Sequence, residues 1–391
     1  MKKIAVITST RAEFGLLMPV LKVLREYENT NLRTELVVTG THLRKEFGHT
    51  IDEIINFKFR IDHEIEIPLK TGEAIDIAMN QAETLKQFAR LFMEQKYSAI
   101  VILGDRYEML AIAVAAGITN TPIFHLCGGD TTEGAIDEWI RHSITKMSYL
   151  HFVTNRESYR RVIQLGENSE RVFNFGSTSM DNILNNAAMP EGEALKSLGL
   201  SPCTYAICTY HPVTLDDGNT QNQMEEFLKA IKLFPEIEFI VTKANADQGG
   251  AYINKILEET ETSISNMHVY ASLGMVRYLS LMKHARFVLG NSSSGIIETP
   301  GFQIPTVNIG DRQKGRLQAE SIINCETDAG SISSAIKKAM TQEFRSLCRN
   351  VVSPYGDGHA GERIAKKIVD TVKAGNIDLK KKFYDMNAQE M

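Results

Sequence analysis

Short apolar runs alternate with segments of helical spacing through the first half of the chain. The apolar runs fall at residues 4–7, 36–38, 99–103, 123–126 and 151–153. Helical spacing of apolar residues is seen at 16–26, 74–95, 107–116 and 136–147. Short β-branched runs predict buried strands, and the longer spacing predicts helices. This rhythm of strand, helix and strand is typical of a doubly wound parallel sheet.

The rhythm breaks at residues 185–202 and then resumes. This stretch contains Asn-Asn-Ala-Ala-Met-Pro-Glu-Gly and ends in Leu-Ser-Pro, which predicts a linker with one helical piece. Beyond it, strands are expected at 205–208, 238–241, 268–270, 287–289 and 306–309. Helices are expected at 224–233, 252–259, 275–283, 331–340 and 362–373.

The predicted fold class is therefore α/β, with two Rossmann-like doubly wound parallel-sheet domains that face a cleft. The N-terminal domain is expected to span 1–185 and to be completed by the C-terminal segment 365–391. Residues 186–364 are expected to form the second domain. Ligands of open α/β sheets bind outside the carboxyl ends of the strands, so the residues that follow the strands are the candidates for chemistry.

The composition of the chain indicates which classes of binding partner and which cellular compartment to expect. The 43 basic and 48 acidic side chains are well mixed and give a net charge of -5, which argues against a nucleic-acid-binding surface. A local arginine cluster can still bind an anion in such a protein. The five cysteines form no CxxC pair, which favours a reducing compartment over a disulfide framework or a zinc site. No signal peptide or membrane-spanning stretch is recognised, so a cytoplasmic protein without a membrane partner is expected.

The first strand leads through Ser-Thr-Arg-Ala-Glu-Phe-Gly, at residues 9–15, into a helix. The N–H groups at that helix start, with Arg11 beside them, could bind a phosphate. A simple helix cap with a solvated arginine explains the pattern equally well. The sequence is not a GxGxxG fingerprint, so a dinucleotide is not favoured.

Two aspartates in the first half are placed for catalysis. Asp105 follows a strand and a glycine, where it serves either as a catalytic carboxylate or, as the local pattern alone favours, as a helix N-cap. Asp137 and Arg141 lie four residues apart and share a helix face. They form either a surface ion pair or a carboxylate that an arginine orients. His125 and His142 are interpreted as packed or helix-face histidines.

The second half carries two motifs that favour phosphate. His211 follows a strand and precedes a proline, and the near-neutral pKa of histidine suits work on a leaving group. A strand then ends in Gly-Asn-Ser-Ser-Ser-Gly at 290–295, and small hydroxyl residues at a helix start bind phosphate through hydroxyls, N–H groups and the helix dipole. A serine-rich N-cap is the alternative. Glu298, one turn later, could reach a ribose hydroxyl.

The following strand leads to Gly-Asp-Arg-Gln-Lys-Gly-Arg at 310–316. Three cations lie within five residues of this strand end, at Arg312, Lys314 and Arg316. A solvated turn is one explanation. Beside the serines, a clamp for a diphosphate is the better one.

As an ordered set, these motifs resemble the UDP-N-acetylglucosamine 2-epimerases, which have the GT-B fold. The resemblance covers essentially the whole chain and is nearer to the hydrolysing, NeuC-type branch that feeds sialic acid synthesis. The residues that carry it are Thr-Arg-Ala-Glu at 10–13, Thr-Gly-Thr-His-Leu at 39–43, Gly-Asp-Arg at 104–106, Arg-His-Ser-Ile-Thr-Lys at 141–146, His-Pro at 211–212, Gly-Asn-Ser-Ser-Ser-Gly at 290–295 and Ile-Gly-Asp-Arg-Gln-Lys-Gly-Arg at 309–316.

Three positions bear on the branch. Non-hydrolysing relatives carry His-Arg-Arg-Glu-Asn, whereas His211 is followed by Pro-Val-Thr, as in the hydrolysing branch. The Gly-Gly-Asp turn that ends at Asp130 also matches that branch. Many relatives have glutamate, a proposed acid or base, where this chain has Cys127. A thiol with a pKa near 8.5 is a poor substitute, so either Cys127 is a bystander or the aspartates carry the proton transfers.

The resemblance implies that the protein converts UDP-N-acetylglucosamine and water to N-acetylmannosamine and UDP. The route would be elimination to 2-acetamidoglucal followed by hydration, as the first step of sialic acid biosynthesis. The expected catalytic residues are Asp105, Asp130, Asp137 and His211. The expected UDP-binding residues are Arg11, Asn245, Ser292, Ser293, Ser294, Glu298, Arg312 and Arg316, with Arg106, Cys127 and Arg141 near the substrate.

The expected partner is a UDP-sugar, with no metal or other cofactor. Relatives are usually oligomers, so a homodimer or homotetramer is expected. Three alternatives stay open: the same reaction on UDP-N,N'-diacetylbacillosamine in the legionaminic acid pathway, a GT-B glycosyltransferase, and a nucleotide-binding protein without activity.

Overall fold

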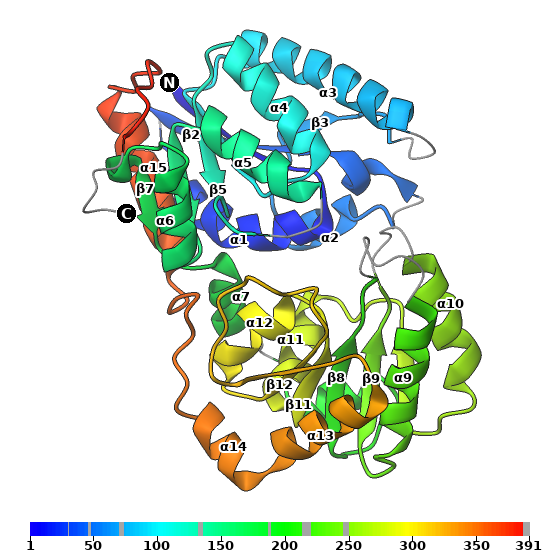
Figure 1. The fold of residues 1–391 in the computed structure, drawn as a ribbon. Helices are drawn as coiled ribbons and strands as arrows, with labels where there is room; N and C mark the ends of the chain where they lie inside the picture. Colours follow the sequence, from blue (N-terminus) through cyan, green and yellow to red (C-terminus); the bar gives the residue numbers. More distant parts are fainter. Residues whose placement is uncertain are drawn as a thin grey trace. The chain divides into compact units, whose positions relative to one another are not determined.

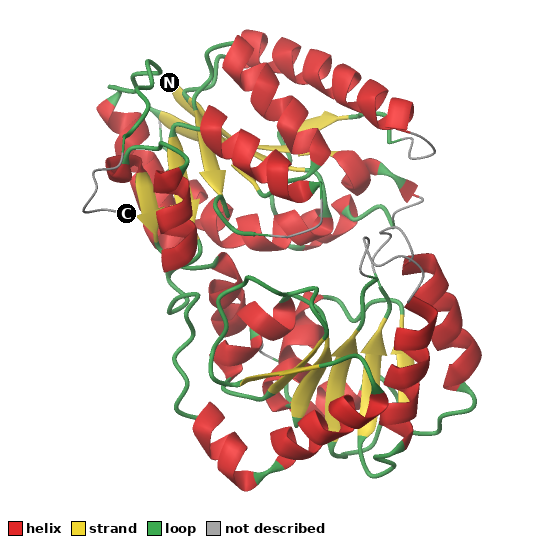
Figure 2. Cartoon of the chain, viewed as in Figure 1, coloured by secondary structure: helices red, strands yellow, loops and turns green. Residues whose placement is uncertain are grey.

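The chain divides into two compact units in the computed structural model (Figure 1). The model describes residues 1–29, 31–45, 48–69, 74–131, 136–186, 189–212, 220–244 and 250–385. Unit 1 comprises Met1–Thr131, Ile136–Asp181 and the C-terminal segment from Gly356, and unit 2 comprises Asn182–Tyr355. Figure 2 shows that each unit has a sheet covered by helices.

Unit 1 is built on a parallel sheet of seven described strands in the order β3-β2-β1-β4-β5-β6-β7. The strands are β1 Lys2–Thr8, β2 Leu32–Thr39, β3 His63–Ile65, β4 Ala99–Leu103, β5 Ile123–Leu126, β6 Leu150–Val153 and β7 Val172–Asn174. The direction of winding reverses between β1 and β4, which are paired directly, with Ile4 of β1 opposite Ala99 of β4. Such a reversal opens the carboxyl edge of a sheet to a ligand.

The helices of unit 1 lie on both sides of this sheet. They are α1 Arg11–Glu26, α2 Ile51–Asn56, α3 Ala74–Gln95, α4 Tyr107–Ile118, α5 Asp137–Met147, α6 Arg156–Gln164, α7 Thr178–Asn186 (which runs into unit 2) and α15 Ala360–Ala374, with single 3-10 turns at Gly40–Leu43 and Ser169–Arg171. Phe88 of α3, Met109 of α4 and Ile140 of α5 share one core cluster with the strand residues Ala5 and Ile7.

The last helix of the chain, α15, packs against the first, α1. Its N-terminus is capped from a distance, because the Asp181 carboxylate accepts from the N–H groups of Ala360 at 3.1 Å and Gly361 at 2.8 Å. Ile364 and Ile368 are buried on the same helix. The final segment of the chain is therefore part of unit 1.

Unit 2 repeats the arrangement with six described strands in the order β10-β9-β8-β11-β12-β13. The strands are β8 Tyr205–Thr209, β9 Glu238–Thr242, β10 Met267–Tyr270, β11 Phe287–Gly290, β12 Thr306–Ile309 and β13 Ile322–Cys325. The helices are α8 Glu191–Lys196, α9 Thr220–Lys232, α10 Gly250–Glu261, α11 Met275–His284, α12 Ser294–Ile297, α13 Ala329–Met340 and α14 Gln342–Cys348, with a 3-10 turn at Thr299–Phe302. Here the winding reverses between β8 and β11.

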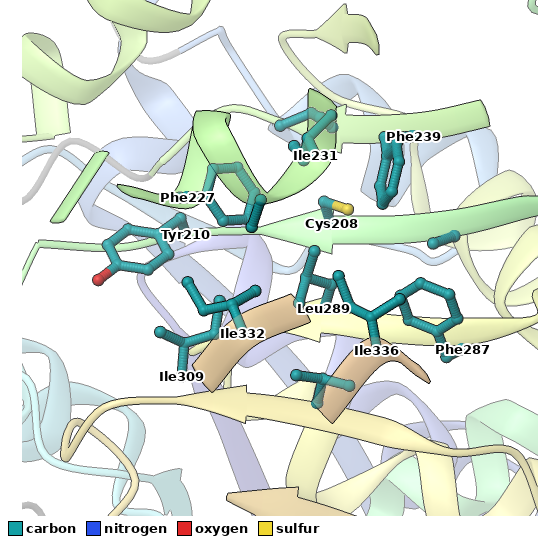
Figure 3. Packing of buried hydrophobic residues seen from close by; sticks show 14 of the residues in the cluster. Cys208, Tyr210, Phe227, Ile231, Phe239, Phe287, Leu289, Ile309, Ile332 and Ile336 are labelled. Atoms are coloured by element: carbon teal, nitrogen blue, oxygen red, sulfur yellow. The ribbon is translucent and has the colours of Figure 1, made fainter. Parts of the chain in front are cut away.

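The inner strands of unit 2 are buried on both faces. In β8, Cys208 belongs to the cluster of Figure 3, where Phe227 of α9 and Ile332 of α13 cover one face of the sheet. Its neighbour Ile207 belongs to a second cluster, with Leu281 of α11. Successive side chains of a strand point to opposite faces. Helices on both sides thus explain why the strands appear in the sequence as continuous apolar runs.

Every strand expected from the sequence is present, but three short edge or near-edge strands, β3, β7 and β13, were not predicted. β3 and β7 have only three residues each, too few for a pattern. Helix α1 begins at Arg11 instead of residue 16, because a capping box at Thr10 starts it early. Helices α2, α6, α7 and α14 were also missed, whereas α12 is the helix expected at the serines and α8 is the helical piece of the expected linker.

We expect Gly361→Ala to lower the melting temperature of the protein. A Cβ at this position would lie 2.7 Å from the Cβ of Pro19 in α1 and 3.0 Å from Asp181 Oδ1. Overpacking of this kind costs about 1–3 kcal/mol, more than the gain in helix propensity. The matched control is Gly117→Ala in α4, where nothing lies within 4 Å of the new Cβ. That variant should melt at or above the wild-type temperature, and equal melting temperatures for both variants would contradict close packing of α15 on α1.

Candidate functional site

The start of α1 is a genuine helix cap. Thr10 Oγ1 accepts from the N–H of Glu13 at 3.3 Å, and Glu13 Oε2 accepts from the N–H of Thr10 at 3.1 Å. The two bonds form a capping box. Arg11 forms an ion pair with Glu53 at 3.0 Å, and its side chain is 36% exposed. The helix cap is therefore confirmed, the arginine is paired with Glu53 where the alternative had it solvated, and phosphate binding by Arg11 stays a prediction.

Two buried carboxyl groups meet beside this cap, where β1 and β4 end. Ser9 Oγ lies 2.8 Å from Glu13 Oε2 and 3.0 Å from Glu108 Oε1. The guanidinium of Arg106 donates to Glu108 Oε1 at 2.8 Å. One cation thus faces two carboxyl groups that water hardly reaches. Burial, followed by repulsion from Glu108, raises the pKa of Glu13 to about 7, so Glu13 retains its proton until pH approaches neutrality.

Asp105 lies next in space to a buried arginine of α5. Its Oδ2 accepts from Arg141 Nη2, and Arg141 Nη1 also donates to the Asp130 carbonyl at 2.7 Å and to Glu138 Oε2 at 3.1 Å. Arg141 is only 3% exposed. Burial opposes its charge, but the carboxylates of Asp105, Asp130 and Glu138 together outweigh burial and raise the pKa of Arg141.

The alternative in which Asp105 caps α4 is wrong. The helix begins at Tyr107 with Arg106 at its N-cap position, and the Asp105 carboxylate bonds to Arg141 instead. Arg141 was expected to orient Asp137, which lies one turn earlier at the first position of α5. The structure adds Asp105, from another strand end, as a partner of the same arginine.

The loop after β5 is tied to α6 through Asp130. Its Oδ1 accepts from Thr154 Oγ1 at 2.9 Å and from Ser158 Oγ at 2.5 Å. Cys127, in the same loop, has a positive φ of 63°, which is uncommon for a residue with a side chain. These contacts give Asp130 a structural function, and its part in proton transfer stays a prediction.

The two histidines beside this loop are packed, as expected. His125 is buried, and its Nε2 donates to the Gly104 carbonyl at 2.8 Å. Burial lowers the pKa of His125 to about 3, so the ring is neutral. His142 lies 3.1 Å from Glu138 Oε1 on the same helix face.

In unit 2, His211 is held through its backbone. Its N–H donates to Asn291 Oδ1 at 2.7 Å, and its carbonyl accepts from Asn291 Nδ2 at 2.8 Å. Burial and the nearby Arg312 lower the pKa of His211 to about 4. Burial therefore moves the pKa of His211 away from the near-neutral ordinary value on which its assignment to the leaving group was based. The neutral imidazole is a hydrogen-bonding group at pH 7, and its buried Nδ1 has no partner among the described residues.

The serines after β11 bond to one another and to α11. Ser292 Oγ lies 2.9 Å from Ser294 Oγ, which lies 2.9 Å from the hydroxyl of Tyr278. The N-cap residue Ser293 makes no side-chain cap bond, so the cap alternative is not seen. The helix α12 has only four residues and Glu298 forms its C-cap, so the expected dipole contribution is small and the hydroxyls are the stronger part of the argument.

The loop after β12 returns to the same point. Arg312 Nη1 and Gln313 Nε2 both donate to the Asn291 carbonyl, at 3.1 Å and 2.8 Å. Arg316 is half-buried in this loop, and Lys314 is exposed. Asn245 lies outside the described residues.

The structure thus gathers the expected residues in two sets, each at the carboxyl edge of its own sheet. Asp105, Asp130 and Arg141 are directly bonded in unit 1. His211 and Arg312 are joined through Asn291 in unit 2. The described residues contain no cluster of three potential metal ligands, and none of their helices is long and apolar enough to cross a membrane.

Sequence reasoning missed four residues of these sets, which are Glu108, Tyr278, Asn291 and Gln313. Glu108 left a signal, because it is the one charged residue in the apolar helix α4. Asn291 stands inside the serine motif but was given no function. Tyr278 contacts Ser294 and Gln313 contacts Asn291, and no pattern in the neighbouring sequence predicts either contact.

The raised pKa of Glu13 should make the stability of the folded protein depend on pH. This pKa is about 7 in the folded protein against an ordinary 4.5. The contribution of Glu13 to the free energy of unfolding is therefore complete below pH 4.5 and is lost as pH rises through 7. Glu13→Gln mimics the protonated group and removes this loss. Between pH 5 and 8, the wild type should lose roughly 2–3 kcal/mol more stability than the variant. Urea unfolding across this range measures the difference.

The control for this experiment is Glu53→Gln, which changes a half-exposed carboxylate on α2. Its stability should follow the wild type with pH. Parallel pH profiles for the wild type and Glu13→Gln would refute a raised pKa for Glu13 in the folded protein.

Comparison with known proteins gives a consistent family. A family model described as UDP-N-acetylglucosamine 2-epimerase matches residues 25–369. A Campylobacter jejuni protein named GDP/UDP-N,N'-diacetylbacillosamine 2-epimerase (hydrolyzing) is 39% identical over 388 residues, which cover 98% of this chain and 99% of that protein. The Escherichia coli polysialic acid biosynthesis protein P7 is 35% identical over 390 residues, covering 99% of this chain and 98% of that protein.

Solved structures share the fold. The co-structure of Staphylococcus aureus MnaA with UDP superposes with a TM-score of 0.77 at 20% identity, covering 99% of this chain and all of that one. The Neisseria meningitidis UDP-GlcNAc 2-epimerase bound to UDP-GlcNAc gives a TM-score of 0.74 at 17% identity, covering 95% of this chain and 100% of that one. The predicted class, two parallel-sheet α/β units of the GT-B kind, is confirmed. With a family model that matches most of its length and relatives of 35% and 39% identity that span nearly all of it, the chain belongs to the UDP-N-acetylglucosamine 2-epimerase family.

Proposed function

We propose that the protein is a hydrolysing 2-epimerase that converts UDP-N-acetylglucosamine and water to N-acetylmannosamine and UDP. The observation that carries the hydrolysing part of the proposal is the 39% identity, over nearly the full length, to a relative whose name includes "hydrolyzing". The choice of UDP-N-acetylglucosamine is supported by the description of the matching family model. His211 followed by Pro212 supports the same branch. We further propose that the enzyme is a cytoplasmic homo-oligomer.

The reaction has two steps. In the first, the C1–O bond to UDP breaks and the proton on C2 passes to a base, which leaves 2-acetamidoglucal and UDP. In the second, water adds its hydroxyl to C1 while an acid delivers a proton to the other face of C2. The net change is hydrolysis with inversion at C2.

The C2 proton becomes acidic only when positive charge builds at C1, so departure of the diphosphate must be stabilised first. Cationic and hydrogen-bonding groups placed where negative charge develops provide this stabilisation. In the proposal, Arg312 and the serine hydroxyls supply it from unit 2, together with Arg11 of unit 1. The neutral imidazole of His211 fits the task of a hydrogen-bond donor to the leaving group, and Glu298 binds the ribose.

Asp105 and Asp137 are the proposed acid–base pair. A group that takes or gives a proton must be held within hydrogen-bond reach of the reacting atom. Arg141 fixes the carboxylate of Asp105 and is itself buried and held by three acceptors. A fixed carboxylate about one-quarter exposed can still reach a substrate. Cys127 is a bystander in this scheme.

A second candidate substrate is UDP-N,N'-diacetylbacillosamine, because the 39% relative and a 32% relative from Legionella pneumophila carry that sugar in their names. The 35% relative, named for polysialic acid biosynthesis, supports the first substrate instead. The chemistry at C1 and C2 is the same for both sugars.

Incubation with each UDP-sugar in D2O, without any acceptor, tests the function. We expect release of UDP and a free 2-epimerised sugar that carries deuterium at C2, because the returning proton comes from solvent. Mass spectrometry and proton NMR identify the sugar and the label, and the faster of the two reactions identifies the substrate. Protium retained at C2, or UDP release only with an added acceptor, would rule out the proposed route.

Asp105→Asn should lower kcat by about 10²–10⁴-fold, as loss of a positioned acid or base does. Binding of UDP should be nearly unchanged, because the diphosphate is assigned to other groups. Turnover assays and calorimetric titration with UDP measure the two effects. The control is Asp357→Asn, which removes an exposed carboxylate paired with Arg363 and should leave turnover unchanged. Near-normal turnover in Asp105→Asn would show that Asp105 is not catalytic.

A further inference from the structure

Asn291 occupies the position directly after β11, at the point where the winding of the sheet in unit 2 reverses. Its side chain is among the most buried polar groups of the unit, since the residue is 1% exposed. A Cβ on the preceding Gly290 would lie 2.0 Å from the Thr209 carbonyl, so the ends of β8 and β11 are in close contact.

The amide of Asn291 extends the pairing of these two strands by one step. Its Oδ1 and Nδ2 bond reciprocally to the N–H and the carbonyl of His211, and its own N–H donates to the Thr209 carbonyl at 3.2 Å. An amide presents one acceptor and two donors on a short side chain, which suits both partners at once. A carboxylate would lack the donor and a hydroxyl would not reach both groups.

The backbone of Asn291 holds the third loop. Its carbonyl accepts from the guanidinium of Arg312 and from the amide of Gln313. Gln313 is 2% exposed, so this link is buried as well. The loops after β8, β11 and β12 therefore share one residue, and these are the loops of unit 2 whose residues are assigned to the diphosphate.

We propose that Asn291 is a positioning residue for UDP, which holds His211, the serines 292–294 and Arg312 in one binding arrangement. The inference rests on the proposed function, because UDP is the ligand that the three loops would share. Asn291 need not touch the ligand. Its effect is to fix the groups that do, and a displacement of about 1 Å in such groups costs up to 10²-fold in rate.

The primary experiment compares two asparagines of unit 2 that are both buried and both bond to backbone groups. Asn266, 7% exposed, donates from Nδ2 to the carbonyls of Phe234 and Ile237 at 2.9 Å each and lies at the start of β10, at the opposite edge of the sheet from the loops. Asn291→Ala and Asn266→Ala remove the same number of atoms. Each protein is titrated with UDP by calorimetry, well below its melting temperature, and assayed for turnover.

We expect Asn291→Ala to weaken UDP binding by at least tenfold and to raise KM similarly. Asn266→Ala should lower the melting temperature and leave the Kd for UDP and the KM within twofold of wild type. Equal Kd values for wild type and Asn291→Ala would overturn the inference, as would equal weakening by both variants, which would mark a general loss of stability.

A second variant keeps the test decisive if Asn291→Ala does not fold. Gln313→Ala leaves the bonds between Asn291 and His211 intact and cuts one link to the loop after β12. It should weaken UDP binding severalfold, and an unchanged Kd would count against the inference.

A double-mutant cycle checks that Asn291 acts through the loops. If it positions Arg312, the losses in UDP affinity from Asn291→Ala and Arg312→Ala should fall short of additivity in the double variant. Strict additivity would contradict positioning. If the wild type itself neither binds UDP nor releases it from a UDP-sugar, the proposed function fails and the inference falls with it. If the wild type binds UDP and Asn291→Ala binds it with the same Kd, the inference about Asn291 is refuted and the proposed function is not.

Discussion

Both sheets consist of parallel strands whose winding reverses once, between β1 and β4 in unit 1 and between β8 and β11 in unit 2. Right-handed crossovers carry the following helices to opposite faces on either side of such a reversal. The carboxyl ends of the two central strands are then left uncovered, and polar side chains can collect there without interrupting the apolar core. Ser9, Asp105, His211 and Asn291 all follow central strands of the two sheets. Side chains at this edge can contact a ligand because the topology leaves the carboxyl ends of the central strands uncovered.

At each edge, a buried polar group is stabilised by more than one partner. Arg141 is held by two carboxylates and a carbonyl, and the Asn291 amide is held by both backbone groups of His211. Buried polar networks of this kind are stable only when their members are satisfied. Glu13 and Glu108 are one exception, because one arginine serves two carboxyl groups and one oxygen of each has no hydrogen-bond partner among the described residues. This shortage of partners goes with the raised pKa of Glu13, which burial and the nearby Glu108 carboxylate produce.

The sequence was sufficient for the inner strands of both sheets and insufficient for three of the edge strands and for the contacts between strand ends. Runs such as 99–103 and 306–309 predict strands because burial on both faces leaves a continuous apolar signature. Asp105 was placed at a strand end, but the local pattern favoured an N-cap, since its partner Arg141 lies 36 residues away. His211 was placed correctly in its loop, whereas its low pKa depends on burial and on Arg312, about 100 residues later. Rules based on neighbouring residues in the sequence cannot detect either of these distant contacts. The same limit hid Asn291, which is 80 residues from the backbone that it binds.

The cap that Asp181 provides for α15 has a consequence for synthesis of the chain. The carboxylate and the helix that it caps are separated by the whole of unit 2. On the ribosome, all strands of both sheets emerge before the helix that covers α1 exists. Unit 2 can therefore reach its native state while the face of α1 that α15 covers is still exposed. The nascent protein would complete its first-made unit last, and a premature stop codon ahead of α15 would leave a finished unit 2 attached to an unfinished unit 1.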